Sequence, residues 1–133
     1  MFGFLRRRGN RAEDAASEHL ARHGYTVLER NVSIGGGELD IVAEDGDTLV
    51  MVEVKARSDD GLGSPEEAIT AAKALRIARA TRAYVQSRRL PDRCVRVDLA
   101  AVALGPDGAP LRVEILEDIL DVEAALRGGA WRR

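Results

Sequence analysis

The residue types best suited to chemistry are two acids and a lysine near the middle of the chain. Twelve residues separate Asp40 from the triplet Glu53-Val54-Lys55. Carboxylate oxygens are hard ligands of the kind that Mg²⁺ and Mn²⁺ prefer, and such an ion polarises a phosphate and lowers the pKa of a bound water. A nearby lysine can orient that water or stabilise developing negative charge. Asp40, Glu53 and Lys55 are therefore candidate catalytic residues for phosphodiester hydrolysis.

A β-hairpin is predicted to bring these side chains together. If Asp45-Gly46 forms a two-residue turn, the antiparallel register places Asp40 opposite Met51. Side chains alternate along a strand, so Glu53 and Lys55 share the face of Met51, and Asp40 and Glu53 become diagonal neighbours. The opposite face of the second strand is then apolar, with Val50, Val52 and Val54.

Lysine is rare in this chain. Only Lys55 and Lys73 are lysine among the 20 basic residues, and all the others are arginine. A lysine ammonium group is a compact point charge, whereas the arginine guanidinium group is planar and spreads its charge. Positions 55 and 73 therefore carry a cation of different chemistry from the other basic residues. The alternative for Glu53 and Lys55 is a solvated strand face with an ion pair of little energetic value. The strongly apolar strand around them favours a functional site.

Hydrophobic patterning predicts an α/β fold with the order α-β-β-β-α-β, followed by an edge strand and a short helix. The first helix starts after Asn10 and ends at Gly24. The strands are expected over residues 25–30, 38–43, 48–57, 93–104 and 111–116, and the later helices over residues 66–89 and 119–126.

Helical periodicity adds two residues to the candidate site. Glu13 falls at the edge of the buried face of the first helix, whereas Asp14 and Glu18 point outward. Lys73 falls within the apolar stripe of the long helix, one turn before Ile77. It either faces a phosphate or extends past its apolar neighbours to solvent.

Nucleic-acid binding in a chain of net charge -2 must come from local clusters of basic residues. The candidates for phosphate contacts are Arg57, Lys73, Arg76 and Arg79. Arg57 can instead close an ion pair, and the helix arginines can form a solvated face. Aromatic residues make up only 4% of the chain, so recognition of backbone shape is favoured over base stacking. His19, His23 and Cys94 are interpreted as core residues.

Composition and length set the wider frame. The chain of 133 residues is expected to form one domain over residues 11–127, with a flexible basic tail at 1–10 and a C-terminal tail at 128–133. Without an apolar run of about 20 residues or the pattern of a secretory signal, the expected location is the cytoplasm, with no membrane partner. The single cysteine excludes an internal disulfide and any cysteine-based zinc site.

The motifs resemble the PD-(D/E)xK nuclease superfamily and, more closely, its YraN-type family of small bacterial predicted endonucleases, which are similar to archaeal Holliday-junction resolvases. The resemblance rests on residues 37–43, residues 52–57, and residues 68–70 with Lys73. It implies a restriction-endonuclease-like αβββαβ core, a mixed sheet flanked by helices. It further implies that Asp40, Glu53, the Val54 carbonyl and Glu13 hold Mg²⁺ or Mn²⁺, with Lys55 as the catalytic lysine. The sequence departs from the family pattern in having Ala12 before Glu13 and Gly36-Gly37 in place of a proline turn.

These observations predict a metal-dependent endonuclease that hydrolyses DNA, including branched or recombination-intermediate DNA. Resolvase-like enzymes act as dimers, so the resemblance allows a homodimer. One alternative is a non-catalytic nucleic-acid-binding or adaptor module that retains the nuclease fold. Another is a structural protein whose charged cluster is an ion-pair network. Two carboxylates facing a phosphate favour the enzyme, because they would repel the phosphate unless a cation intervened.

Overall fold

The computed structural model describes residues 11–58, 69–90 and 92–128. The predicted tail at 1–10, residues 129–133 of the C-terminal tail and residues 66–68 of the predicted long helix lie outside this range. The helical prediction is wrong for Ile69 and Thr70, because the long helix begins at Ala71. The elements, in chain order, are α2 (Arg11–Arg22), β1 (Thr26–Ile34), β2 (Gly37–Asp45), β3 (Thr48–Ser58), α3 (Ala71–Ser87), β4 (Cys94–Leu104), β5 (Pro110–Leu116) and α4 (Val122–Leu126). The predicted order of helices and strands is confirmed.

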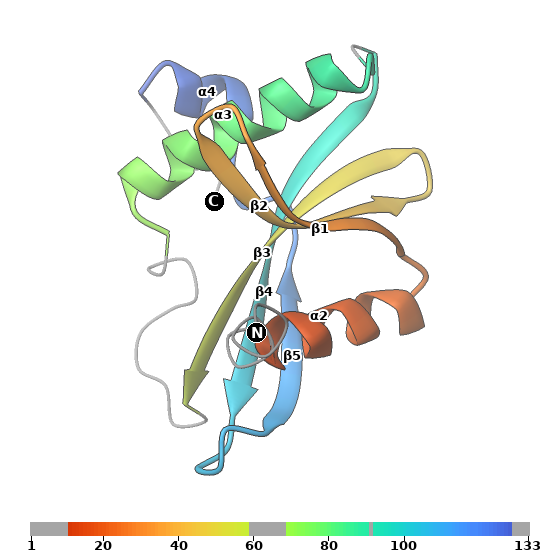
Figure 1. Cartoon of the computed structure of the whole chain (residues 1–133), viewed down its shortest axis with the longest axis vertical. Helices are drawn as coiled ribbons and strands as arrows, with labels where there is room; N and C mark the ends of the chain where they lie inside the picture. The colour runs from red at the N-terminus through yellow and green to blue at the C-terminus, as the bar shows by residue number, and fades with distance from the viewer. Residues whose placement is uncertain (1–10, 59–68, 91, 129–133) are drawn as a thin grey trace, which may run out of the picture.

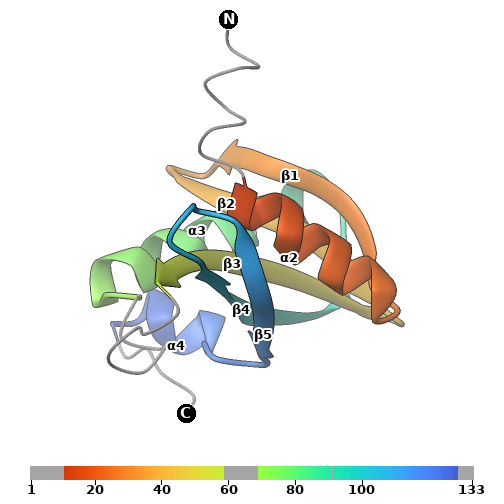
Figure 2. The same ribbon diagram turned by 90° about the horizontal axis from the view of Figure 1, so that it is seen from below.

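The five strands form one mixed sheet in the order β1-β2-β3-β4-β5. Strands β3 and β4 are parallel, joined by the crossover that contains α3, and the other neighbours are antiparallel. Helix α2 covers one face of the sheet, and α3 and α4 cover the other (Figures 1 and 2). The predicted α/β fold, a mixed sheet flanked by helices, is thus confirmed and is consistent with a restriction-endonuclease-like core.

Each face of the sheet buries its own hydrophobic cluster. Val50 and Val52 pack with the α2 residues Ala16 and Leu20, and the partly buried Val54 packs against this cluster. The predicted valine face is therefore confirmed. The other cluster joins Met51 and its neighbours to Ile69, which precedes α3, and to the apolar stripe of α3, which includes Ala74, Ile77, Ala80 and Tyr84. No helix among the described residues is long and apolar enough to cross a membrane.

The predicted turn of the β2–β3 hairpin is wrong by one position. Asp45 pairs with Thr48, so the two turn residues are Gly46 and Asp47. Gly46 has a φ of 60°, and a two-residue hairpin turn requires positive φ at its first central position. The register therefore slips by two residues, and Met51 lies opposite Val42. A slip of two preserves the side-chain faces, so the same-face prediction for Asp40 and Glu53 survives. The predicted diagonal arrangement is wrong, because the same register, extended by one pair beyond Ile41 and Val52, places the two acids directly opposite each other.

Strands β2 and β3 separate at the position of the two acids. Within the described strands, their pairing ends at Ile41 and Val52, while β3 continues beside β4 as far as Ser58. The end of β3 and the β1–β2 turn accordingly run in different directions (Figure 1). Asp40 and Glu53 are the next residues of each strand, and they flank the opening of this wedge.

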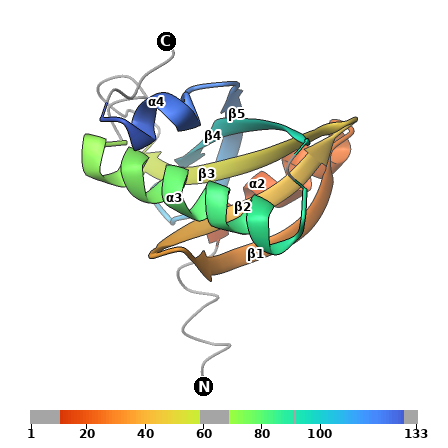
Figure 3. The same cartoon turned by 90° about the horizontal axis from the view of Figure 1, so that it is seen from above.

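Helix α3 approaches the β1–β2 turn so closely that only glycine fits beneath it (Figure 3). A Cβ atom at Gly37 would lie 2.5 Å from the backbone oxygen of Arg76, and one at Gly35 would lie 2.9 Å from that of Arg79. This contact fixes the height of α3 above the sheet. The same contact therefore determines how far the side chains in the first turns of α3 extend over the sheet.

We expect Gly37→Ala to destabilise the protein by about 1 to 3 kcal/mol, because the added methyl group must push α3 away from the sheet. Urea unfolding measures the effect. Gly105→Ala is the matched control, since its Cβ would make only ordinary contacts, the nearest at 3.4 Å. Equal stability of the two variants would show that α3 yields freely and that the close approach does not hold it in place.

Two predicted core residues are at the surface. Cys94 is exposed because it is the first residue of β4, where it pairs with Thr48 at the end of the sheet. His23 is exposed, and His19 is half-buried. The His23 Nδ1 atom lies 2.7 Å from the His19 carbonyl oxygen, and the two rings stack with their centroids 4.1 Å apart at the C-terminal end of α2. The core interpretation is therefore wrong for Cys94 and His23.

Candidate functional site

A pocket of about 360 Å³ lies at the wedge between β2 and β3. It is rich in charged side chains from both helices and both strands. Because the strands have separated here, an acid of α2 on one face and a lysine of α3 on the other face line the same space. The lining residues are Glu13, Glu38, Asp40, Glu53, Val54, Lys73, Arg76 and Ile77.

The Asp40 side chain replaces a backbone hydrogen-bond partner that β3 lacks where it separates from β2. Its Oδ2 atom accepts a hydrogen bond of 2.9 Å from the backbone N–H of Val54. This bond lies just beyond the last β2–β3 pair, so the carboxylate satisfies an amide that the wedge leaves without a strand partner. The bond holds the Asp40 side chain beside the Glu53-Val54 segment.

Glu53 is almost completely buried, with 6% of its surface exposed. Burial, followed by repulsion from Asp40, raises the pKa of Glu53 from its ordinary 4.5 to about 7. The opposing influence is Lys73, whose Nζ atom lies 2.5 Å from Glu53 Oε2. The carboxyl group is therefore held in a place where negative charge is unfavourable and only partly compensated.

Glu13 lies on α2 at the other side of the pocket. Burial and then repulsion from Asp40 raise its pKa, against hydrogen bonds from Asn31 and Arg30 that lower it. Arg30 Nη2 lies 3.4 Å from Glu13 and 2.9 Å from the exposed Asp14, so its charge is shared. Asp14 and Glu18 are exposed, as the helical pattern predicts. Glu13 and Glu53 thus both respond to the charge of Asp40.

The two lysines lie in different surroundings. Lys73 reaches Glu53 across the pocket, so the alternative that it extends only to solvent is wrong. Lys55 is exposed, and it is absent from the described residues that line the pocket. Its catalytic role therefore remains a prediction, and Lys73 is the lysine that the structure places beside the acids.

The predicted phosphate-binding arginines are distributed over two elements. Arg76 is exposed and lines the pocket one turn after Lys73, and Arg79 is exposed further along α3. Arg57 is half-buried near the end of β3 and has interactions of its own. Glu38 is a pocket acid that sequence reasoning missed. Its position two residues before Asp40 on β2 is the alternation signal that would have identified it.

The donor set suits a hard divalent cation. Asp40, Glu53 and Glu13 offer carboxylate oxygens in one pocket, and the Val54 backbone borders them. In the described part of the chain, no three acidic, histidine or cysteine side chains already converge on one point. Mg²⁺ commonly binds through one or two carboxylates and keeps several waters, so two acids are sufficient. Burial, and then repulsion from Asp40, raises the pKa of Glu13 and Glu53, and a bound cation would relieve the repulsion among these acids.

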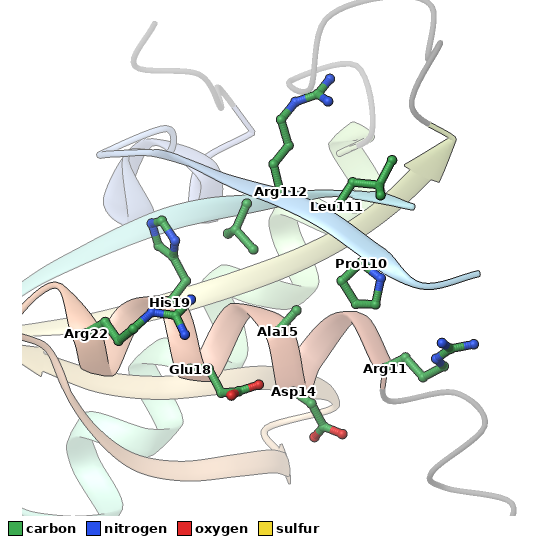
Figure 4. Close-up of a pocket in the computed structure, with 10 residues that line it drawn as sticks. Arg11, Asp14, Ala15, Glu18, His19, Arg22, Pro110, Leu111 and Arg112 are labelled. Carbon is green, nitrogen blue, oxygen red and sulfur yellow. The ribbon is translucent and has the colours of Figure 1, made fainter. Parts of the chain in front are cut away.

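A larger hollow of about 650 Å³ lies elsewhere, between α2 and β5 (Figure 4). It is open and is lined by residues of mixed charge, including Arg11, Asp14, Glu18 and Arg22. None of the predicted catalytic residues lines it. We therefore place the candidate site in the smaller pocket, where the buried Glu53 and the half-buried Glu13, both with raised pKa values, lie.

Comparison with known sequences identifies relatives along most of the chain. The sequence profile of the Uncharacterised protein family UPF0102 matches residues 12–102. A UPF0102 protein of Syntrophus aciditrophicus is 40% identical over 116 residues, which cover 87% of this chain and 90% of the relative. One from Nitratidesulfovibrio vulgaris is 42% identical over 126 residues, covering 93% and 92%, respectively. UPF0102 is the YraN family, so the predicted resemblance is confirmed.

Proposed function

Since the chain belongs to the Uncharacterised protein family UPF0102, whose description names no activity, we propose its function from the pocket: a divalent-metal-dependent endonuclease that hydrolyses DNA. The observation that carries the proposal is the meeting of Asp40 and Glu53 at the β2–β3 wedge, with Glu13 beside them and cationic side chains at the rim. A purely structural ion-pair network would balance its acids. Here burial, and then repulsion from Asp40, raises the pKa of both Glu13 and Glu53 instead.

The roles follow from chemistry and position. Asp40 and Glu53, with the Val54 carbonyl and Glu13, would hold Mg²⁺ or Mn²⁺, which supplies phosphate polarisation and a more acidic water when bound. Asp40 is oriented for this role by the Val54 N–H. Lys55 would stabilise negative charge that develops as water attacks the phosphorus and the bond to the leaving oxygen breaks. Lys73, Arg76 and Arg79 would hold the substrate phosphates, and Arg57 would act further along β3.

The exposed face of α3 supports a nucleic-acid substrate. Arg76, Arg79 and Arg82 are all exposed there, beginning at the pocket and continuing along the helix. A row of this kind contacts phosphates and carries no base specificity, which fits recognition by backbone shape. We propose DNA, including branched DNA, as the substrate class.

A cleavage assay tests the proposal directly. Labelled single-stranded, duplex, flapped and four-way DNA, together with RNA, is incubated with Mg²⁺, Mn²⁺ or EDTA. We expect metal-dependent cutting of DNA by the wild-type protein and none by Asp40→Ala. Asp47→Asn is the matched control, because Asp47 is an exposed acid in the turn at the other end of the same hairpin.

The other outcomes separate the alternatives. Equal cutting by the wild-type protein and Asp40→Ala would reveal a contaminating nuclease. Salt-sensitive binding without cutting would favour a non-catalytic adaptor, an alternative to which the position of Lys55 outside the pocket lends some support. If the protein neither cuts nor binds any of these nucleic acids, the assayed classes are excluded as its substrates.

A further inference from the structure

Lys73 is held at the pocket from the first turn of α3. Thr70 caps this helix, and its side chain accepts a hydrogen bond of 3.1 Å from the Lys73 backbone N–H. The next residue, Ala74, is buried, which anchors the turn against the core. The Lys73 side chain, 37% exposed, extends from the surface to the nearly buried Glu53 carboxylate. Its ammonium group therefore enters the acidic pocket from the solvent side.

The pocket lining carries more negative than positive groups. Among the described residues that line it, four are acids, Glu13, Glu38, Asp40 and Glu53, and two are cations, Lys73 and Arg76; Arg30 pairs with Glu13 from outside this lining. Of these two cations, Lys73 makes the direct contact, at 2.5 Å from Glu53 Oε2. A substrate phosphate would meet excess negative charge as long as Lys73 is engaged in this way.

A divalent cation and the Lys73 ammonium cannot both sit on the same Glu53 oxygen at contact distance. Two positive charges so close together in a partly buried site repel each other strongly. Glu53 is the best-buried acid of the pocket, where screening by solvent is weakest. Lys73 and a divalent cation therefore compete for this carboxylate.

Resting on the proposed metal-dependent function, we propose that Lys73 is the internal counter-ion of the metal-free pocket. Its ammonium group competes with a divalent cation for the Glu53 carboxylate, and cation binding releases Lys73 to contact the substrate phosphate. The metal is then bound before the phosphate, since it both neutralises the acids and frees the lysine. Arg76, one turn further along α3, is the second cation at the same rim.

The scarcity of lysine makes the release observable in the unmodified chain. Labelling with ¹⁵N and ¹³C lysine gives signals from only two side chains, Lys55 and Lys73, which Lys55→Arg and Lys73→Arg assign. On titration with Mg²⁺, we expect the Lys73 signal to move toward the position of a solvated lysine and its ammonium protons to exchange faster with water. The Lys55 signal should move less. A Lys73 signal that stays unchanged while Mg²⁺ binds would overturn the proposal.

Metal affinity gives a second readout that is independent of cleavage. We expect Lys73→Met to bind Mn²⁺ roughly tenfold more tightly than the wild-type protein in calorimetry, because the competing cation is removed. Lys55→Met is the matched control and should change the affinity far less, since Lys55 is exposed outside the pocket lining. Circular dichroism confirms that each variant is folded.

The outcomes distinguish this inference from the proposed function. Equal Mn²⁺ affinity of Lys73→Met and the wild-type protein would refute the counter-ion role and leave the metal-dependent function standing. Binding by Lys73→Met alone would support the counter-ion role even if no cleavage is found. Failure of both proteins to bind Mn²⁺ or Mg²⁺ would overturn the metal site and, with it, both proposals.

Discussion

Asp40→Asn is expected to abolish metal-dependent cleavage and, in the metal-free protein, to raise the melting temperature. Cleavage should fall by about 10²-fold or more, the scale seen when a preorganised charge is removed from an active site. Stability should rise because the Asp40 charge disfavours the ionised forms of Glu13 and Glu53. The asparagine oxygen can still accept the Val54 N–H, so the strand contact is retained. A gain of about 1 kcal/mol corresponds to roughly 4 °C in melting temperature.

The size of this gain should depend on pH. Glu53 has a pKa of about 7 in the folded protein and an ordinary value of 4.5, so its protonated form stabilises the fold below pH 4.5. That contribution is lost as the pH rises through 7. The advantage of Asp40→Asn over the wild-type protein should therefore be small at pH 4.5 and largest at pH 8. Thermal melts in EDTA across this range measure it.

Asp47→Asn is again the control, with unchanged cleavage and melting temperature expected. A lower melting temperature for Asp40→Asn would contradict the interpretation, because it would make the acids part of a stabilising ion-pair network. Acids that lower the free energy of unfolding are typical of functional pockets, where residues are selected for activity rather than for stability.

Asp98→Ala is expected to cause the largest loss of stability. Asp98 is completely buried on β4 and accepts hydrogen bonds from Arg96 Nε at 2.9 Å and Arg96 Nη2 at 3.1 Å. It also accepts one of 2.9 Å from the backbone N–H of Asp118, just before α4. Removing the carboxylate leaves a largely buried arginine and a backbone donor without this partner. Breaking a buried pair of this kind costs about 3 to 5 kcal/mol.

Urea unfolding with a fluorescence or circular-dichroism signal measures the loss. Asp14→Asn is the matched control, because Asp14 pairs with Arg30 at 57% exposure and such surface pairs contribute little. Cleavage per folded molecule should be retained by Asp98→Ala, since Asp98 is outside the pocket lining. A stability equal to that of the control would show that Arg96 finds full compensation in Asp45 and Glu117, its other acidic neighbours.

Two errors of the sequence analysis have the same physical origin. Hydrophobic and helical patterns are averages over several residues, so they are weakest at the ends of elements. Cys94 begins β4, and His23 follows the last residue of α2, and both are exposed although the pattern placed them in the core. The hairpin turn was misplaced because Gly46 can occupy either central turn position, and only the cross-strand pairing selects one of them.

Local patterns in the sequence were enough to determine the order of the elements, the apolar faces of β3 and α3, and the placement of Asp40 and Glu53 on one face of the hairpin. The period of two along a strand made that last inference robust to the error in the turn. The tertiary structure alone decided where β2 and β3 separate, how Glu13 and Lys73 come to line one pocket from opposite faces, and why Glu38 borders it while Lys55 does not. These features depend on the height of α3 above Gly37 and on the divergence of two strands. Both arise from contacts between residues far apart in the chain, which local periodicity does not encode.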